Sequence, residues 1–92
     1  MHYILFYEAV ENYVEKRAPY REEHLKLIQS FYDRGNLIMA GATGEPASGG
    51  VLIFKGEDTK QAEAFAACDP YVQNGLIKNW YIKPWKVVIG DK

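Results

Sequence analysis

Short apolar runs alternate along this chain with longer stretches that mix apolar and charged residues. Four of the runs have the length and composition of strands, and they cover residues 2–7, 37–41, 51–54 and 76–89. Pro84 interrupts the last run, and a proline cannot donate a hydrogen bond to a neighbouring strand. The pattern therefore predicts four strands, the last of which is bulged or lies at a sheet edge.

Apolar residues spaced three and four apart predict two helices between these strands. The first has Pro19 in its first turn and ends at about Arg34, before Gly35. The second follows Asp58 or Thr59, either of which can cap it, and packs through Ala62, Phe65, Ala66 and Ala67. Residues 11–17, 44–50 and 69–75 are expected to form short turns or loops.

The resulting order, β-α-β-β-α-β, predicts an α+β fold of the ferredoxin-like type. This is a four-stranded antiparallel sheet with two helices on one face. The first three strands are apolar at consecutive positions, whereas a sheet with one face in water should alternate apolar with polar residues. Two helices cover only one face. We therefore expect a second copy of the chain to cover the other, as a two-fold homodimer packed sheet against sheet.

Composition narrows the classes of function. Ninety-two residues suit one domain, residues 1–92, and a net charge of −1 gives no electrostatic reason to bind nucleic acid. Cys68 is the only cysteine, so no internal disulfide can form, and a reducing cytoplasmic setting is expected. Its thiol is expected to be buried and inert. There is no signal-peptide pattern and no apolar run long enough to span a membrane. Two histidines without a carboxylate cluster give no metal site, and no cofactor motif is present.

His24 is the most informative candidate residue because it falls on the apolar stripe of the first helix, with Tyr20, Leu27, Ile28 and Phe31. A buried imidazole needs a hydrogen-bonding partner, and Asp69, in Asp69-Pro70-Tyr71, is the best candidate. A His–Asp pair can serve as a general acid or base. His24 can equally be a core histidine, and Asp69 can be only the N-cap of the next turn.

Arg21 lies three residues before His24 on the same side of the helix and could hold a substrate carboxylate or phenolate. Arg17 could act in the same way, and either arginine could instead be a solvated surface residue. Ser48 could donate a hydrogen bond to a ligand or serve the chemistry of its turn. Aromatic residues could line a ligand pocket or belong to the core: Tyr3, Tyr7, Tyr71, Trp80, Tyr81 and Trp85.

Several motifs in this order resemble the YCII-related (YciI-like) family of small dimeric α/β-barrel proteins. They are Arg21-Glu22-Glu23-His24-Leu25, Asp33-Arg34-Gly35-Asn36-Leu37 with Ala40-Gly41, Asp69-Pro70-Tyr71 with Gly75, and Lys83-Pro84-Trp85. The resemblance implies a ferredoxin-like fold paired into a barrel and an active site around His24 and Asp69. One branch of the family is similar to dehydrochlorinases of chlorinated hydroxyquinols, and the fold is shared with muconolactone isomerases.

Two functions remain open at this point. The first is a cofactor-independent isomerase or dehydrohalogenase-type lyase. His24 and Asp69 would transfer a proton on a small aromatic or enol-lactone substrate held by Arg21, Arg17, Ser48 and Tyr71. The second is a module that binds or senses a small molecule without chemistry. An RNA-binding module of the same strand order is disfavoured, because the strands lack the aromatic and basic pattern that such modules use.

Overall fold

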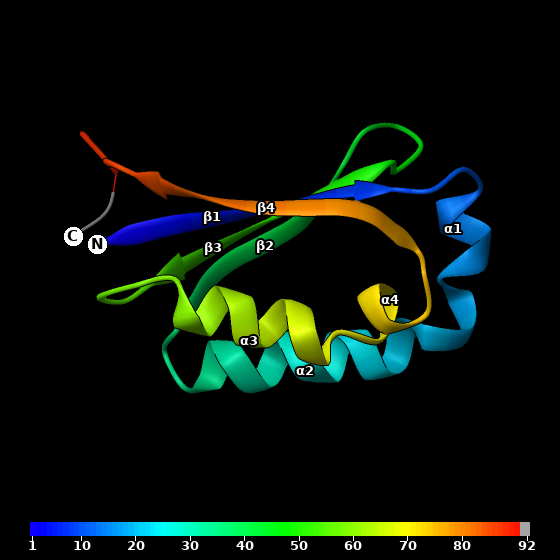
Figure 1. Ribbon diagram of the computed structural model, residues 1–92, viewed down its shortest axis with the longest axis horizontal. Coiled ribbons are helices and arrows are strands. Elements are labelled where there is room, and N and C mark those ends of the chain that lie inside the picture. The colour runs from blue at the N-terminus through cyan, green and yellow to red at the C-terminus, as the bar shows by residue number, and fades with distance from the viewer. Residues whose placement is uncertain (91–92) are drawn as a thin grey trace.

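Figure 1 shows the computed structural model, which describes residues 1–90. Residues 91 and 92 of the predicted domain lie outside this described range. In chain order the elements are β1 (His2–Ala9), α1 (Tyr13–Lys16), a 3₁₀ turn (Ala18–Tyr20), α2 (Arg21–Asp33), β2 (Leu37–Thr43), β3 (Gly49–Lys55), α3 (Lys60–Cys68), α4 (Pro70–Gln73) and β4 (Ile77–Trp85).

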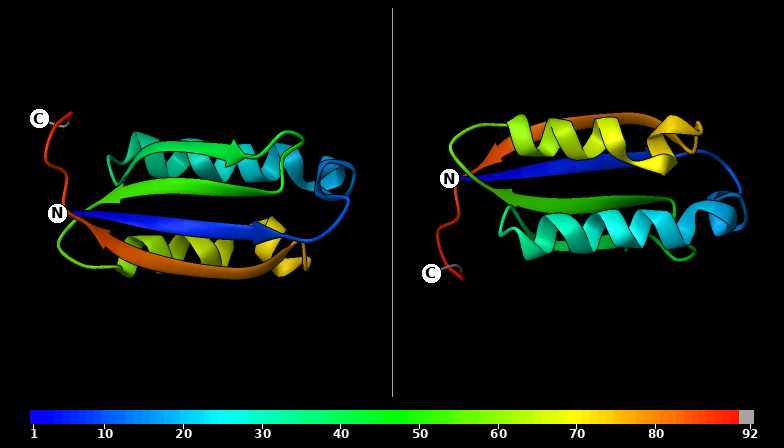
Figure 2. Two further views of the ribbon diagram at one scale, coloured as in Figure 1. Left: turned by 90° about the horizontal axis from the view of Figure 1, so that it is seen from above. Right: turned by 90° about the horizontal axis from the view of Figure 1, so that it is seen from below.

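The strands form one antiparallel sheet in the order β2-β3-β1-β4. Helices α2 and α3 lie side by side on one face of this sheet, with α4 at the end of α3 (Figure 2). The predicted ferredoxin-like fold is confirmed. No helix within residues 1–90 combines the length and apolar character needed to cross a membrane.

Pro19 lies in the 3₁₀ turn, so α2 begins at Arg21, two residues later than the sequence pattern predicts. Thr59 is the N-cap residue of α3, but the Asp58 side chain accepts the hydrogen bond from the Lys60 N–H. Both candidate caps therefore take part in starting this helix.

The last strand ends at Trp85 and not at Ile89, as its apolar composition predicts. Strand β4 pairs only with β1, and Trp85 already lies opposite His2, where β1 begins. Met1, the residue before this pair, lies outside β1, and its carbonyl accepts the Gly56 N–H, so the β1–β4 ladder ends here. The expected edge position of Pro84 is confirmed, since β4 is an outer strand.

The helix-facing side of the sheet carries the core. Leu5, Leu52 and Phe54 are almost fully buried there, with Phe31 of α2 and Phe65 of α3 packed edge to face against Phe54. Ala62 and Ala66 complete the packing of α3 as predicted, but Ala67 is exposed. The expectation that Cys68 is buried is wrong: it follows Ala67 on the outer side of the helix.

The opposite face of the sheet has no covering element within residues 1–90 (Figure 2). Apolar side chains alternate onto it from every strand, and the Phe6 and Tyr81 rings stack there with centroids 5.0 Å apart. Met39 remains 64% exposed and Trp85 40% exposed. We refer to Ile4, Phe6, Met39, Val51, Ile53, Tyr81 and Trp85 as the open face.

Candidate functional site

A cavity of about 200 Å³ lies between the first half of α2 and the sheet. Its roof comes from α2 and the residues before it, and its floor comes from β1, β2 and β3. The lining residues are Tyr7, Tyr13, Arg17, Arg21, His24, Leu25, Ile28, Ala40, Gly41, Ala42, Gly49, Gly50 and Leu52.

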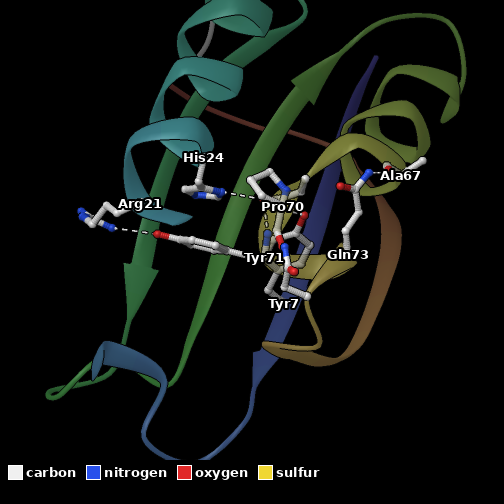
Figure 3. Close-up of polar contacts among 9 residues, drawn as sticks. Tyr7, Arg21, His24, Ala67, Pro70, Tyr71 and Gln73 are labelled. Carbon is white, nitrogen blue, oxygen red and sulfur yellow. Dashed lines mark hydrogen bonds and ion pairs between the residues drawn. The ribbon is translucent and has the colours of Figure 1, made fainter. Parts of the chain in front are cut away.

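His24 and Asp69 are in direct contact. His24 Nδ1 lies 2.8 Å from Asp69 Oδ1, and the two residues are 8% and 0% exposed. Figure 3 shows a hydrogen bond as the dashed line that leaves the His24 ring. A carboxylate only accepts hydrogen bonds, so the ionised Asp69 requires the proton on Nδ1 of the imidazole. This leaves Nε2 as the nitrogen with an unshared electron pair in the neutral ring. Because His24 lines the cavity, Nε2 is the atom suited to take a proton from a ligand there.

Asp69 also caps the short helix α4. Its Oδ1 accepts the Tyr71 backbone N–H at 3.0 Å, and Pro70 occupies the first helical position, where no N–H is needed. Its Oδ2 accepts the Tyr7 hydroxyl at 2.8 Å. Capping and pairing with His24 are therefore both present in one carboxylate, and Asp69 is not only an N-cap.

Tyr71 fixes the imidazole from a second direction. The His24 and Tyr71 rings are stacked, with centroids 3.8 Å apart and planes at 10° (Figure 3). The Tyr71 hydroxyl accepts a long hydrogen bond of 3.4 Å from Nη1 of Arg21. The imidazole is thus held by its Nδ1 and by one of its faces.

Two phenols at the cavity resist ionisation. Burial raises the pKa of Tyr7 strongly, and the adjacent Asp69 carboxylate raises it further by its charge and its hydrogen bond. Burial also raises the pKa of Tyr13, with a smaller contribution from Tyr71, although Arg17 acts in the opposite direction. Both side chains therefore remain neutral hydrogen-bond donors at physiological pH.

The structure brings most of the sequence candidates together but not all of them. Arg17 and Arg21 line the cavity beside His24, and the Arg17 guanidinium lies 5.2 Å from the centre of the Tyr13 ring. Ser48 does not line this cavity. It lies in the β2–β3 turn, where its N–H donates to Thr43 and its carbonyl accepts from Ala9, so its observed contacts are those of a turn.

Two tyrosines that line the cavity, Tyr7 and Tyr13, are not singled out by the sequence. Tyr7 is noted there only as one of several aromatics, yet its position on β1, two residues after Leu5, places it on the helix-facing side. Strand alternation could therefore have identified it. Tyr13 belongs to a four-residue helix with no periodicity to reveal its inward face. Within residues 1–90, no group of three or more His, Cys, Asp or Glu side chains is placed to bind a metal ion.

Comparisons with known proteins give matches over nearly the whole chain. The model of the YCII-related domain matches residues 1–86. An uncharacterised protein of Haemophilus influenzae is 31% identical over 99 residues, covering 96% of this chain and 99% of its own length. Protein YciI of Escherichia coli is 31% identical over 97 residues, with the same coverage.

Solved structures share the fold. One is the 5-chloro-2-hydroxyhydroquinone dehydrochlorinase TftG of Burkholderia phenoliruptrix, in complex with 2,5-dihydroxybenzoquinone. It superposes with a TM-score of 0.77 at 18% identity, covering 94% of each chain. A protein of Agrobacterium tumefaciens gives a TM-score of 0.55 at 18% identity, covering 90% of this chain and 89% of its own.

Proposed function

Since this chain belongs to the YCII-related family, we propose that it is a cofactor-independent proton-transfer enzyme acting on a small aromatic or enol-lactone substrate. The observation that carries the proposal is the buried Asp69 carboxylate. It binds Nδ1 of His24 at 2.8 Å and leaves Nε2 for a ligand in the cavity. A core histidine would need a partner as well, but it would not need to line a cavity beside two arginines.

His24 is the proposed base. Nε2 accepts a proton from an O–H or an acidic C–H of the substrate, and Asp69 stabilises the imidazolium that results. In an elimination, the electron pair left behind forms a new double bond, and a halide departs with the electrons of its bond to carbon. In an isomerisation, the imidazolium returns the proton to a different carbon. Neither course needs an oxidant, a reductant or a metal.

Arg17 and Arg21 are the proposed substrate-binding residues. Both line the cavity, and a guanidinium can hold a carboxylate or phenolate through two parallel hydrogen bonds. Within residues 1–90, Nη1 of Arg21 makes a long hydrogen bond of 3.4 Å to Tyr71, which leaves its other donors for a ligand. Tyr71 is proposed to position the imidazole by stacking on it.

The dehydrochlorination catalysed by TftG, which has the same fold, makes elimination of a hydrogen halide the first reaction to test. We further propose a homodimer closed by the open face, because a largely apolar sheet face, interrupted by Lys83 opposite Ile4, is rarely left in water. A cytoplasmic location is in keeping with a chain whose one cysteine is a free thiol.

The test is halide release and product formation from a panel of chlorinated hydroxyquinols and enol lactones. The native protein is compared with His24→Gln and with the control Tyr32→Phe, which changes an exposed ring on the far half of α2. We expect turnover by the native protein and the control, and a loss of about 10²–10⁴-fold in His24→Gln. Full turnover by a folded His24→Gln protein would rule out the base. Substrates bound and recovered unchanged would favour the binding module.

A further inference from the structure

The cavity exists because the helix-facing side chains of two strands become smaller toward one end of the sheet. On β3 the helix-facing positions run from Phe54 through Leu52 to Gly50. On β2 they run from Leu37 to Ala40 and Ala42, and the register places Ala42 directly opposite Gly50. The large residues lie under the second half of α2, and the small residues lie under His24 and Arg21.

Gly50 is not required by its backbone. A methyl group built on it would make only ordinary contacts, at 3.4 Å to the Gly41 carbonyl and at 3.9 Å to Cβ of Tyr7. Its φ is also in the range that other residues adopt. A methyl group at this position would therefore fit between the strands, and because Gly50 lines the cavity, a larger side chain would take up cavity space.

Leaving this space unfilled costs stability. A glycine inside a strand weakens it, and a void beside the core loses packing contacts that a valine or leucine would supply. Gly50 and Ala42 lie opposite each other, and the backbone does not require glycine at position 50. A ligand that occupies the cavity would explain why both residues are small.

We propose that Gly50 and Ala42 are specificity-determining positions, whose missing side chains admit one flat, anionic six-membered ring beneath His24. A cavity of about 150 Å³ suffices for benzene, so the observed volume of about 200 Å³ leaves room for one ring with a few small substituents. Arg17 and Arg21 at the same cavity provide the positive charge for the anionic oxygens. This inference rests on the proposed function and adds to it the size of the substrate.

The experiment measures binding of 2,5-dihydroxybenzoquinone by isothermal titration to the native protein, Gly50→Val and Ala42→Leu. Gly56→Val is the matched control, because a methyl group built on Gly56 would meet only the Asp58 carbonyl, at 3.8 Å, far from the cavity. The fused two-ring analogue 2-hydroxy-1,4-naphthoquinone is titrated in parallel, and the melting temperature of each variant is recorded.

We expect the one-ring quinone to bind the native protein and the control alike, and the two-ring analogue to bind more weakly. Gly50→Val and Ala42→Leu should each lose about tenfold or more in affinity while melting at the same or a higher temperature. Undiminished binding in both cavity variants, equal affinity for the two quinones, or no binding to the native protein would each overturn the inference. A lower melting temperature in both variants would also overturn it, because the small residues would then be needed for packing.

These outcomes are separate from the test of the base. If His24→Gln still binds the one-ring quinone but the native protein turns over no substrate, the proposed chemistry fails while the size selection stands. If Gly50→Val binds the one-ring quinone as the native protein does and His24→Gln loses turnover, the size selection fails while the proposed chemistry stands.

Discussion

The imidazole of His24 lies flat against the phenol ring of Tyr71, with the ring centroids 3.8 Å apart. The same tyrosine donates its backbone N–H to Asp69, the carboxylate that binds Nδ1 of His24. Tyr71 therefore fixes both members of the pair, one through its ring and the other through its backbone. Because His24 lines the cavity, the remaining nitrogen, Nε2, is the one left to act on a ligand there.

Replacing Asp69 by Asn should change the tautomer of His24. The carboxylate holds the proton on Nδ1, and its loss removes the reason for that arrangement, so the neutral ring should shift toward the Nε2–H form. Nitrogen-15 shifts of the ring, read from two-bond proton–nitrogen correlations, distinguish the two forms. Turnover should fall by about 10²–10⁴-fold because Nε2 would no longer be a base.

Asp33→Asn serves as the control for that experiment, because Asp33 is an exposed carboxylate that bonds Gln29 on the same helix. It should leave the His24 tautomer unchanged. If the ring of His24 keeps its proton on Nδ1 in a folded Asp69→Asn protein, Asp69 does not set the tautomer.

The protein should lose stability above about pH 10 because of Tyr7. A phenol in the unfolded chain ionises near pH 10, while burial and Asp69 raise the pKa of Tyr7 in the folded protein. Above this pH the unfolded state binds fewer protons, so the free energy of unfolding falls by about 1.4 kcal/mol per pH unit for this group. Below pH 10 the contribution is complete and does not vary.

Urea unfolding at pH 8 to 11 measures this dependence. Tyr7→Phe should be less stable at pH 8, through the lost bond to Asp69, but its stability should decline less steeply above pH 10. Tyr32→Phe, at an exposed position, should retain the native slope. Identical slopes for the native protein and Tyr7→Phe would mean that Tyr7 ionises as easily folded as unfolded.

A charge in the middle of the open face should separate the proposed homodimer. Ile53 lies on the central strand β3, opposite Ile4 and Met39 on the strands to either side. Ile53→Glu would place an unpaired carboxylate in an apolar interface, which is strongly unfavourable. Sedimentation equilibrium should report twice the chain mass for the native protein and one chain mass for Ile53→Glu.

Ser30→Glu adds the same charge to the exposed side of α2 and should leave the dimer intact. A native protein that sediments as one chain at micromolar concentration would refute the dimer without reference to any variant.

Gly49→Ala should destabilise the protein, in contrast to substitutions at the neighbouring Gly50. A methyl group on Gly49 would collide with the backbone carbonyl of Tyr7, which cannot move without disturbing the β1–β3 ladder. We expect a loss of about 1–3 kcal/mol, or a fall of several degrees in melting temperature. Gly56→Ala, which meets no close atom, should have little effect, and an equal change in both proteins would contradict this account.

The strand and helix order could be read from the sequence because each element carries a local signal. The apolar runs gave the four strands, and the spacing of Leu27, Ile28 and Phe31 around His24 gave α2. The end of β4 could not be read in this way. Val88 and Ile89 are as apolar as the strand before them, and what stops β4 is the start of its partner β1, a non-local fact.

In the candidate site, too, the features with a local sequence signal could be predicted and those that depend on non-local contacts could not. Asp69 next to Pro70 signals a cap, and His24 on an apolar stripe signals a buried partner, so this pair could be anticipated. The place of Ser48 could not be anticipated, because a turn residue gives no indication of which side of the sheet edge it faces. The cavity could not be anticipated either, because it depends on the register that places Gly50 of β3 opposite Ala42 of β2.

Asp69 joins parts of the chain that are far apart in sequence, since Tyr7 is 62 residues away from it and His24 is 45 residues away. No hairpin or helix pair can assemble these three groups alone, because β1, α2 and the start of α4 must all have docked. Competence for ligand binding should therefore return only with the final closure of the chain topology during refolding, and it can serve as a reporter of the completed fold.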